Sequence, residues 1–317
     1  MDPPAVTKCT CVDCNEDKVC GGLWLGNRYP GMPSEEEAIH IKMHIVISHC
    51  KKSLDCWMPK YLEGFKNVAS IHVISKCGQE VKGAPNETTT VVVPNVGREG
   101  HAFAYYITEI LPQLVTQQFG GLIGLSTGRG SPATTAKYDK SIIVFLKDTT
   151  MTKIHQNRVA TGQLRHIDLK SLVRIASSVN GFACGLDLGG GNGKFSAYHD
   201  VNTLYKQELR VYNKGEKDYQ RDVVPFRSNY STLGDFYKAL NATSPSDLVQ
   251  VCYGGVFATS TEHIFKQDMN VWRTLEKALE RGDNIQEGHF AERSWGPLLA
   301  TPLKPFQIEA LSMGTWG

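Results

Sequence analysis

Apolar residues in this chain fall into short, β-branched runs separated by stretches of helical spacing. The strongest runs are Met43–His49, Ala69–Ser75, Thr88–Val93 and Ser141–Lys147. Continuous apolar runs of this length are typical of strands that are buried on both faces of a parallel sheet. A later segment, Val249–Ser260, also begins as a strand and contains a Gly-Gly pair. The pattern predicts an α/β fold, with a mostly parallel twisted sheet and flanking helices.

Helical spacing occurs in three stretches between and after these runs. Apolar residues in Ala102–Leu114 recur three and four positions apart, and Pro112 is expected to kink or end that helix. Asp168 is placed to cap a helix over Leu169–Val179. Asn270–Arg281 shows the pattern of an amphipathic helix. Strands that alternate with helices of this length favour a layered α/β architecture.

The length of the chain suits one large globular domain or two smaller ones. The sequence has 317 residues, of which 41% are hydrophobic. Residues 1–40 are rich in Cys, Pro and Gly and predict a loop-like N-terminal extension. Residues 41–300 predict a single α/β domain, and 301–317 an extended C-terminal tail. The polar stretch 200–248 is interpreted as a surface excursion.

The charge balance argues against two classes of partner. The net charge is +2, from 34 basic and 32 acidic residues. This balance predicts neither nucleic-acid binding nor attachment to a membrane through a polybasic patch. A window of about 18 apolar residues is missing, so no membrane span is expected.

The cysteines form one cluster and a scattered set. The cluster, Cys9 to Cys20, has the spacing C-x-C-x2-C-x5-C, which is compatible with a zinc site or with two local disulfides. The scattered cysteines, most of them in or beside apolar segments, are predicted to be free thiols that pack as small hydrophobes. They are Cys50, Cys56, Cys77, Cys184 and Cys252.

Localisation is open between two compartments. Sequons for N-glycosylation begin at Asn86, Asn229 and Asn241, and they matter only in a secretory lumen. Together with the cysteine cluster they favour a lumenal glycoprotein. The first residues, Met1–Cys11, contain no apolar leader, which favours the cytoplasm or a targeting segment outside this sequence.

A first group of candidate site residues follows the third predicted strand. Asn95 lies in a tight turn, and Arg98, Glu99 and His101 come at the start of the next helix. The start of a helix favours an anion, and a guanidinium can bind a phosphate or carboxylate through two parallel hydrogen bonds. The alternative is that Arg98 and Glu99 pair on the surface while His101 packs inside.

A second group follows the apolar run that ends at Lys147. Asp148 comes next, and Thr149 and Thr150 follow it. A carboxylate at the carboxyl end of a central strand suits a metal ligand or a base, and it suits a local cap equally well.

A third group lies near the C-terminus, at what reads as a helix start. Here His289, Glu292, Arg293 and Trp295 bring together an imidazole, an acid, a base and an indole. The alternative is an internal ion pair between Glu292 and Arg293 that braces the last helix.

These segments together resemble the DUF3431 family, a group with glycosyltransferase-like features. The resemblance rests on HIVISHCKKSLDCW, NVGREGH, FLKD, YGGVFATSTEHI and ERSWG, and it covers roughly residues 43–300. It implies a fold like that of GT-A nucleotide-diphospho-sugar transferases. It also implies transfer of a sugar from a nucleotide-sugar donor to a glycan or protein-glycan acceptor.

The resemblance implies a role for each candidate. Asp148 is expected to act in catalysis as a ligand of the donor sugar or of a divalent cation, Mn²⁺ or Mg²⁺, and Glu292 as the base. The sequence departs from the Asp-x-Asp pattern of such transferases, because Thr149 and Thr150 follow Asp148; Lys147 or Arg98 would then neutralise the diphosphate instead. The expected donor-binding residues are Asn95, Arg98, His101 and Lys147. The expected acceptor-side residues are His289, Arg293 and Trp295.

Two other functions are compatible with the residues. The segment LDLGGGNG at 186–193 resembles the first motif of S-adenosylmethionine-dependent methyltransferases, in which Glu208 would bind the ribose. A glycine-rich turn in a loop is the favoured alternative, because the run before the motif is a poor strand and the segment after it shows no clear helix. The missing second acid after Asp148 is also compatible with a catalytically silent GT-A-like binding protein.

Overall fold

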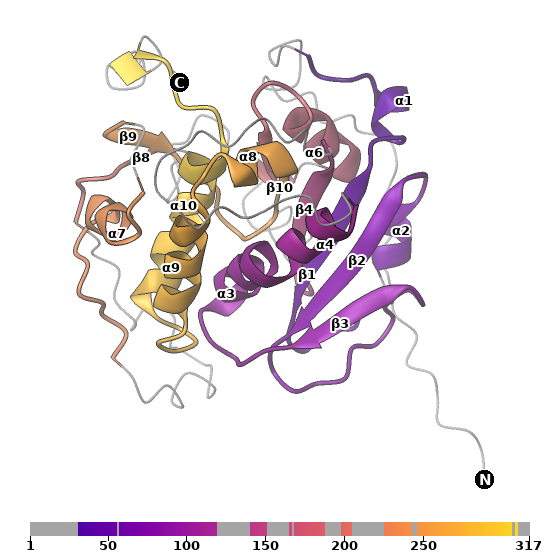
Figure 1. Ribbon diagram of the computed structural model, residues 1–317, viewed down its shortest axis with the longest axis horizontal. Helices are drawn as coiled ribbons and strands as arrows, with labels where there is room; N and C mark the ends of the chain where they lie inside the picture. Colours follow the sequence, from indigo (N-terminus) through magenta and orange to yellow (C-terminus); the bar gives the residue numbers. More distant parts are fainter. Residues whose placement is uncertain are drawn as a thin grey trace.

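A six-stranded sheet forms the centre of the protein (Figure 1). The computed structural model describes residues 31–55, 57–118, 140–150, 165–166, 168–187, 198–204, 225–242, 246–305 and 308–309. In spatial order the strands are β3 (Thr88–Val92), β2 (Val68–Ser75), β1 (Met43–His49), β4 (Ile142–Lys147), β10 (Phe257–Ser260) and β6 (Phe182–Cys184).

The predicted α/β architecture is confirmed. Strands β3, β2, β1 and β4 run parallel, whereas β10 is antiparallel to both of its neighbours, β4 and β6. Every residue of β1 and β4 is buried, as the continuous apolar runs predicted. Two small antiparallel sheets join β5 (Arg165–His166) to β7 (Leu186–Asp187) and β8 (Tyr198–Asp200) to β9 (Leu248–Gln250).

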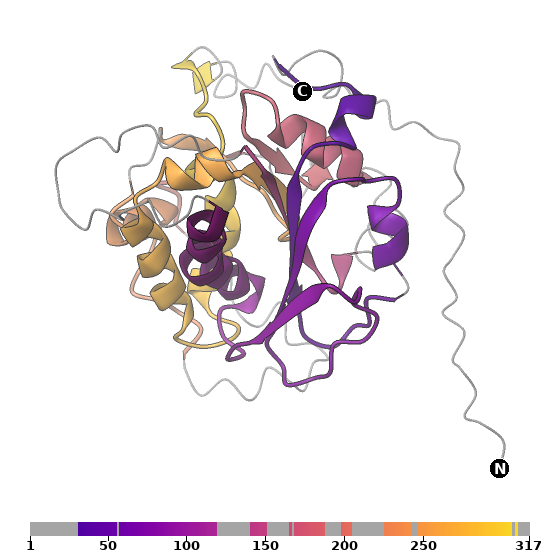
Figure 2. The same ribbon diagram turned by 45° about the vertical axis from the view of Figure 1, so that its right-hand side comes forward.

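Helices cover both faces of the sheet (Figure 2). One face packs against α3 (Arg98–Tyr105), α9 (Met269–Leu279) and α10 (Gln286–Leu299). The other packs against α2 (Met58–Leu62) and α6 (Leu169–Ala176). Asp168 caps α6 as predicted, since its side chain accepts from the backbone of Ser171.

An aromatic stack joins the sheet to α10. The Phe145 and Phe257 rings lie 4.7 Å apart, and the Trp295 ring lies 5.2 Å from Phe257. Phe145 faces α3 and α10, while its neighbours Val144 and Leu146 face α6. Because side chains alternate along a strand, Lys147 points to the same face as Phe145.

The helix that begins at Arg98 does not end at Pro112. It continues through a π-helical segment, η1 (Tyr106–Ile110), into α4 (Leu111–Gln118), so Pro112 is the second residue of α4. A proline ring clashes with the carbonyl four residues earlier and has no N–H to donate. The wider π turn directly before Pro112 accommodates both restrictions within one continuous helix.

Two segments that were expected to be irregular contain helices. The end of the N-terminal extension forms α1 (Glu35–Ala38), because Ser34 and Glu37 make a reciprocal capping box. The expected surface excursion contains α7 (Leu233–Ala239), which Thr232 and Asp235 cap in the same way. Three residues of α7 are buried, so this segment belongs to the core: Leu233, Phe236 and Tyr237.

Two boundaries near the C-terminus also differ from prediction. The expected strand Val249–Ser260 is divided into β9 and β10, because Gly254 and Gly255 have φ angles of 89° and 64° and turn the chain between them. Helix α8 (Thr261–Phe265) follows directly, with Ser260 as its cap. The residues expected at a helix start, from His289 onward, lie inside the 14-residue α10.

The prediction of free, scattered thiols is wrong for four cysteines. Disulfides join Cys50 to Cys77 and Cys184 to Cys252. Cys50 and Cys77 follow the neighbouring strands β1 and β2, and Cys184 in β6 meets Cys252 in the segment between β9 and β10; the linear spacing reveals neither pairing. The N-terminal cluster and Cys56 lie outside the described residues.

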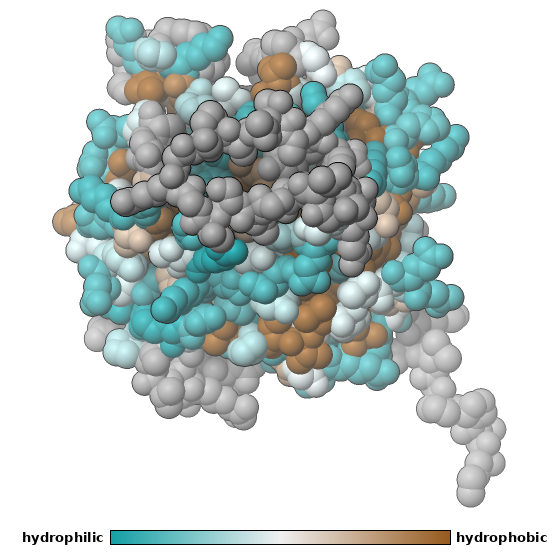
Figure 3. Space-filling view, in the orientation of Figure 1, coloured by the Kyte–Doolittle hydropathy of each residue, from teal (hydrophilic) through white to brown (hydrophobic). Residues whose placement is uncertain are grey.

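The surface in the orientation of Figure 1 mixes hydrophilic residues with scattered hydrophobic ones (Figure 3). None of the helices in the described ranges is long and apolar enough to cross a membrane.

Candidate functional site

Three of the candidate segments in the sequence meet at the carboxyl edge of the parallel strands. Strand β4 ends there at Lys147, and α3 begins there at Arg98. The turn Tyr253–Val256, which leads into the antiparallel β10, reaches the same edge and contacts α10. In open α/β sheets this edge is where ligands bind.

A buried ion pair connects the end of β4 to α3. The Lys147 Nζ atom lies 3.0 Å from Glu99 Oε1, and the two side chains are 7% and 12% exposed. Arg98 Nε lies 3.9 Å from the other oxygen of Glu99. Glu99 therefore lies between two cations, one buried and one partly exposed.

The backbone at the start of α3 adopts an uncommon conformation. Gly97 and Arg98 both have positive φ angles, 57° and 52°. Only glycine adopts this region without strain, and non-glycine residues held there cluster at functional sites. A Cβ at Gly97 would also lie 2.6 Å from Leu279 Cβ, so a larger residue does not fit.

A buried lysine holds this turn in place. The Lys76 ammonium group, just after β2, donates to the carbonyls of Val96, at 2.5 Å, and Arg98. Burial lowers the pKa of Lys76 to about 8. Its hydrogen bonds to the two carbonyls fix the backbone on either side of Gly97.

The Gly254-Gly255 turn brings a second acid, Glu292, to the charged cluster that Arg98, Glu99 and Lys147 form. The Gly254 N–H donates to Glu292 Oε1 at 2.7 Å. A Cβ at Gly255 would lie 2.8 Å from Glu99 Cγ, so this position admits only glycine while Glu99 keeps its place. The turn thus contacts both carboxylates, and Glu292 is only partly buried.

One further cation and an imidazole complete the site. The Arg293 guanidinium lies 5.0 Å from the centre of the Tyr253 ring, and its Nη1 donates to the His289 carbonyl at 2.8 Å. Burial, with a further contribution from the nearby Arg98, lowers the pKa of His289 to about 4. His289 is therefore neutral at physiological pH.

The arrangement suits the binding of an anion next to a proton acceptor. Arg98 is the partly exposed cation, at the start of an eight-residue helix. Guanidinium groups and helix starts both favour phosphates and carboxylates. Glu292 offers a carboxylate within the same cluster, and the neutral His289 can exchange hydrogen bonds without adding charge.

Asp148 lies at the same strand end but has a different environment. Its Oδ2 atom accepts hydrogen bonds from the backbone N–H groups of Cys50, Lys51 and Lys52 at 2.9, 2.8 and 2.9 Å. This carboxylate holds the loop that follows β1. These three hydrogen bonds match the local cap that the sequence offers as the alternative to a metal ligand.

A group that could hold a metal ion in the described part of the chain lies elsewhere. His101, Glu276 and Glu280 place their ligand atoms within 4.8 Å of one another between α3 and α9. Burial lowers the pKa of His101 to about 4. Glu280 is exposed and Glu276 accepts from Thr108 at 2.5 Å, and such acidic pairs on a helix are common without an ion.

Two other candidates lie apart from the charged cluster. Asn95 donates to Asp283 at 3.3 Å at the surface. Trp295 is 1% exposed and belongs to the aromatic stack of the core. The glycine motif at 188–193 and Glu208 lie outside the described residues.

The sequence pointed only indirectly to Lys76, Glu99 and Tyr253. Glu99 was noted as a possible surface partner of Arg98, whereas its main partner is Lys147, from a distant strand. The signal available for Lys76 was a lone cation directly after a buried strand, and for Tyr253 an aromatic residue directly before the glycine pair.

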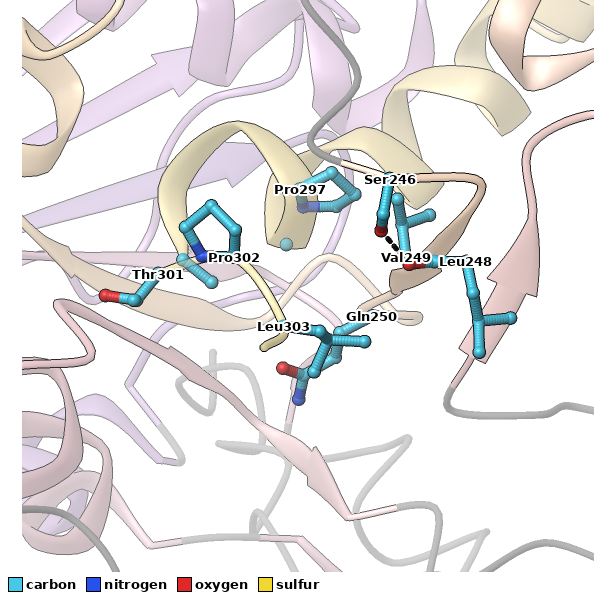
Figure 4. Close-up of a pocket in the computed structure, with 10 residues that line it drawn as sticks. Ser246, Leu248, Val249, Gln250, Pro297, Thr301, Pro302 and Leu303 are labelled. Carbon is cyan, nitrogen blue, oxygen red and sulfur yellow. Dashed lines mark hydrogen bonds between the residues drawn. The ribbon is translucent and has the colours of Figure 1, made fainter. Parts of the chain in front are cut away.

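A separate shallow pocket lies between β9 and the end of α10 (Figure 4). Its lining residues include none with an ionisable side chain, so it offers no chemistry of its own. They are Ser246, Leu248, Val249, Gln250, Gly296, Pro297, Ala300, Thr301, Pro302 and Leu303.

No family model, curated protein or solved structure matches this chain. The resemblance to the DUF3431 family therefore stays a prediction.

Proposed function

We propose that this protein is a glycosyltransferase that moves a sugar from a nucleotide-sugar donor to a glycan or protein-linked glycan acceptor. The observation that carries the proposal is the pairing of Arg98 and Lys147 with Glu99 at the carboxyl edge of the sheet, where the Gly254-Gly255 turn contacts both Glu99 and Glu292. A mostly parallel sheet with one antiparallel strand beside β4 is compatible with the GT-A-like fold that the sequence resembles.

The chemistry requires stabilisation of a departing nucleoside diphosphate. As the bond from the sugar C1 to the phosphate oxygen breaks, negative charge grows on the diphosphate. In our proposal Arg98 binds this anion at the start of α3. Lys147 neutralises Glu99, so that the positive charge of Arg98 is available to the diphosphate. We assign this role to cations on the protein because Asp148 already accepts three backbone N–H groups.

The acceptor must lose a proton as its oxygen bonds to C1. Glu292 is the proposed base of an inverting reaction, because its carboxylate is partly exposed and is oriented by the Gly254 N–H. Neutral His289, and Arg293 with Tyr253, form the proposed acceptor side. Trp295 supports α10 from the core instead of contacting a sugar.

Donor binding is tested by calorimetric titration with uridine and guanosine diphosphates. We expect Arg98→Gly to weaken binding by about tenfold or more, because a charge-assisted contact contributes about 1.5–3 kcal/mol. Glycine suits the positive φ of Arg98, so this variant keeps the turn. Asn241→Gly is the matched control, because Asn241 also has a positive φ, 56°, but lies after α7, and this variant should bind as the parent does. All proteins are produced in the bacterial periplasm, where disulfides form, in cells that attach no N-glycans. Equal binding by both variants would contradict the proposed role of Arg98.

Turnover separates a transferase from a silent binding protein, the second candidate that the environment of Asp148 favours. We expect Glu292→Gln to reduce sugar transfer roughly 100- to 10,000-fold with little change in donor binding, because the amide oxygen still accepts from Gly254 but cannot take a proton. Donor binding without transfer by the parent protein would establish the silent protein. A response to S-adenosylmethionine alone would instead favour the methyltransferase.

A further inference from the structure

We propose that Asn86, Asn229 and Asn241 carry N-linked glycans. All three are exposed, and each lies outside the helices and strands. Asn86 precedes β3, Asn229 precedes α7, and Asn241 directly follows α7. Each begins an Asn-x-Ser/Thr triplet, the acceptor for N-glycosylation. This inference is independent of the function proposed above.

The side chains of these asparagines are available for modification. In the described part of the structure, none of the three amide groups makes a hydrogen bond. In contrast, four asparagines outside the triplets donate through their side chains to neighbouring groups: Asn67, Asn95, Asn180 and Asn202. A glycan on any of the three would thus replace no interaction of the fold.

The disulfides provide the second, independent argument. Every cysteine in the described ranges is paired, Cys50 with Cys77 and Cys184 with Cys252. Structural disulfides form and persist in oxidising compartments and are rare in the cytosol. The compartment in which these bonds form in a eukaryotic cell, the secretory lumen, is also where N-glycans are attached. The covalent structure and the exposed triplets therefore point to the same place of maturation.

The modification is a group transfer from a lipid-linked donor. The side-chain amide nitrogen attacks C1 of an oligosaccharide that is carried on a polyprenyl diphosphate. The C1–N bond forms, the C1–O bond to the diphosphate breaks, and the amide loses one proton. The lipid diphosphate departs with the bonding electrons, and no oxidant or reductant is needed.

The test uses the full chain purified from the cells that produce it. Peptide N-glycosidase releases the glycan and converts the modified asparagine to aspartate, which peptide mass spectrometry locates. We expect conversion at Asn86, Asn229 and Asn241. Asn270 is the matched internal control, because it is equally exposed but is followed by Val271 and Trp272. Absence of conversion at the three positions overturns the proposal, as does conversion at Asn270.

Variants made in the same cells identify each site on a gel. Asn229→Gln and Ser231→Ala should each remove the same glycan, whereas Ser231→Thr should retain it because the triplet is preserved. Asn270→Gln should leave the mobility unchanged. A mobility loss in Ser231→Ala that Ser231→Thr shows equally would overturn the assignment at Asn229, because it would not depend on the triplet.

Discussion

Lys147 and Asp148 are adjacent in sequence and both buried at the end of β4, yet they serve different parts of the molecule. Lys147 points to α3 and pairs with Glu99, beside Arg98 and the glycine turn. Asp148 turns to the loop after β1 and accepts three backbone N–H groups. Two adjacent charged residues at the end of a strand therefore do not form a single site here. Alternation of side chains divides them between a candidate ligand-binding region and a structural cap.

The largest expected effect is a loss of stability when Lys147 is replaced. Lys147→Met removes the nearest cation of Glu99, whose side chain is 12% exposed and keeps Arg98 at 3.9 Å. Removal of one partner of a buried pair costs about 3–5 kcal/mol, and we expect a loss toward the lower end of that range. Urea unfolding should show this loss, and Glu99→Gln in the same chain should recover much of it. Lys52→Met, at an exposed position, is the control and should change the free energy of unfolding by less than about 0.5 kcal/mol. A small loss in Lys147→Met would mean that the pair contributes little.

Acidification should weaken the site region next. The folded-state pKa of His289 is about 4, below the ordinary value of 6.5. Between these values the unfolded chain binds a proton that the folded protein does not, so stability falls as pH decreases from about 6.5 to 4. The loss for this imidazole is on the order of 3 kcal/mol.

The measurement is the free energy of unfolding against pH for the parent and His289→Asn. The variant should lose less stability over this interval. In the parent protein, Arg98 and Arg293 oppose protonation of His289, whereas Glu99 and Glu292 favour it. Parallel pH profiles for parent and variant would show that His289 is protonated equally in the folded and unfolded states.

A smaller effect is expected on the Asp148 side. Asp148→Ala leaves the N–H groups of Cys50, Lys51 and Lys52 without their acceptor, which should reduce stability by about 1–3 kcal/mol. Asp148→Asn keeps an acceptor oxygen and should lose less. It is produced in cells that attach no N-glycans, because the substitution creates an Asn-x-Thr triplet with Thr149 and Thr150. Calorimetric titration with Mn²⁺ should show no difference in Mn²⁺ affinity between the parent and Asp148→Ala. Loss of a measurable Mn²⁺ affinity in Asp148→Ala would instead make this residue a metal ligand.

The smallest effect should be a gain. Arg98→Gly relieves a positive φ at a non-glycine residue, which costs about 1 kcal/mol in the parent, while glycine gives the unfolded chain more freedom. The net change in the free energy of unfolding should lie between zero and about 1 kcal/mol in favour of the variant. Thermal unfolding measures this change, with Asn241→Gly as the matched variant and all proteins produced in cells that attach no N-glycans. A clear loss of stability would show that the Arg98 side chain contributes more to folding than its backbone strain removes.

The amino-acid sequence alone determined the strands, several helix starts and the class of fold. Buried parallel strands must be apolar throughout, and this is why β1 and β4 could be read directly from their runs. Asp168 caps α6 through a contact three residues away, so this feature was also local. The start of α3 and the charged residues Arg98, Glu99 and Lys147 are also local features, because each lies at the predicted end of a strand or start of a helix.

Only the tertiary structure decided how these pieces combine. The Lys147–Glu99 pair spans 48 positions and the Gly254–Glu292 hydrogen bond 38. The disulfide partners are 27 and 68 residues apart. Helical and strand patterns repeat over a few residues, so they contain no information on which distant side chains meet. Packing of α3 and α10 against the sheet brings Lys147 to Glu99, leaves Asp148 to the neighbouring loop and buries Trp295 in the core.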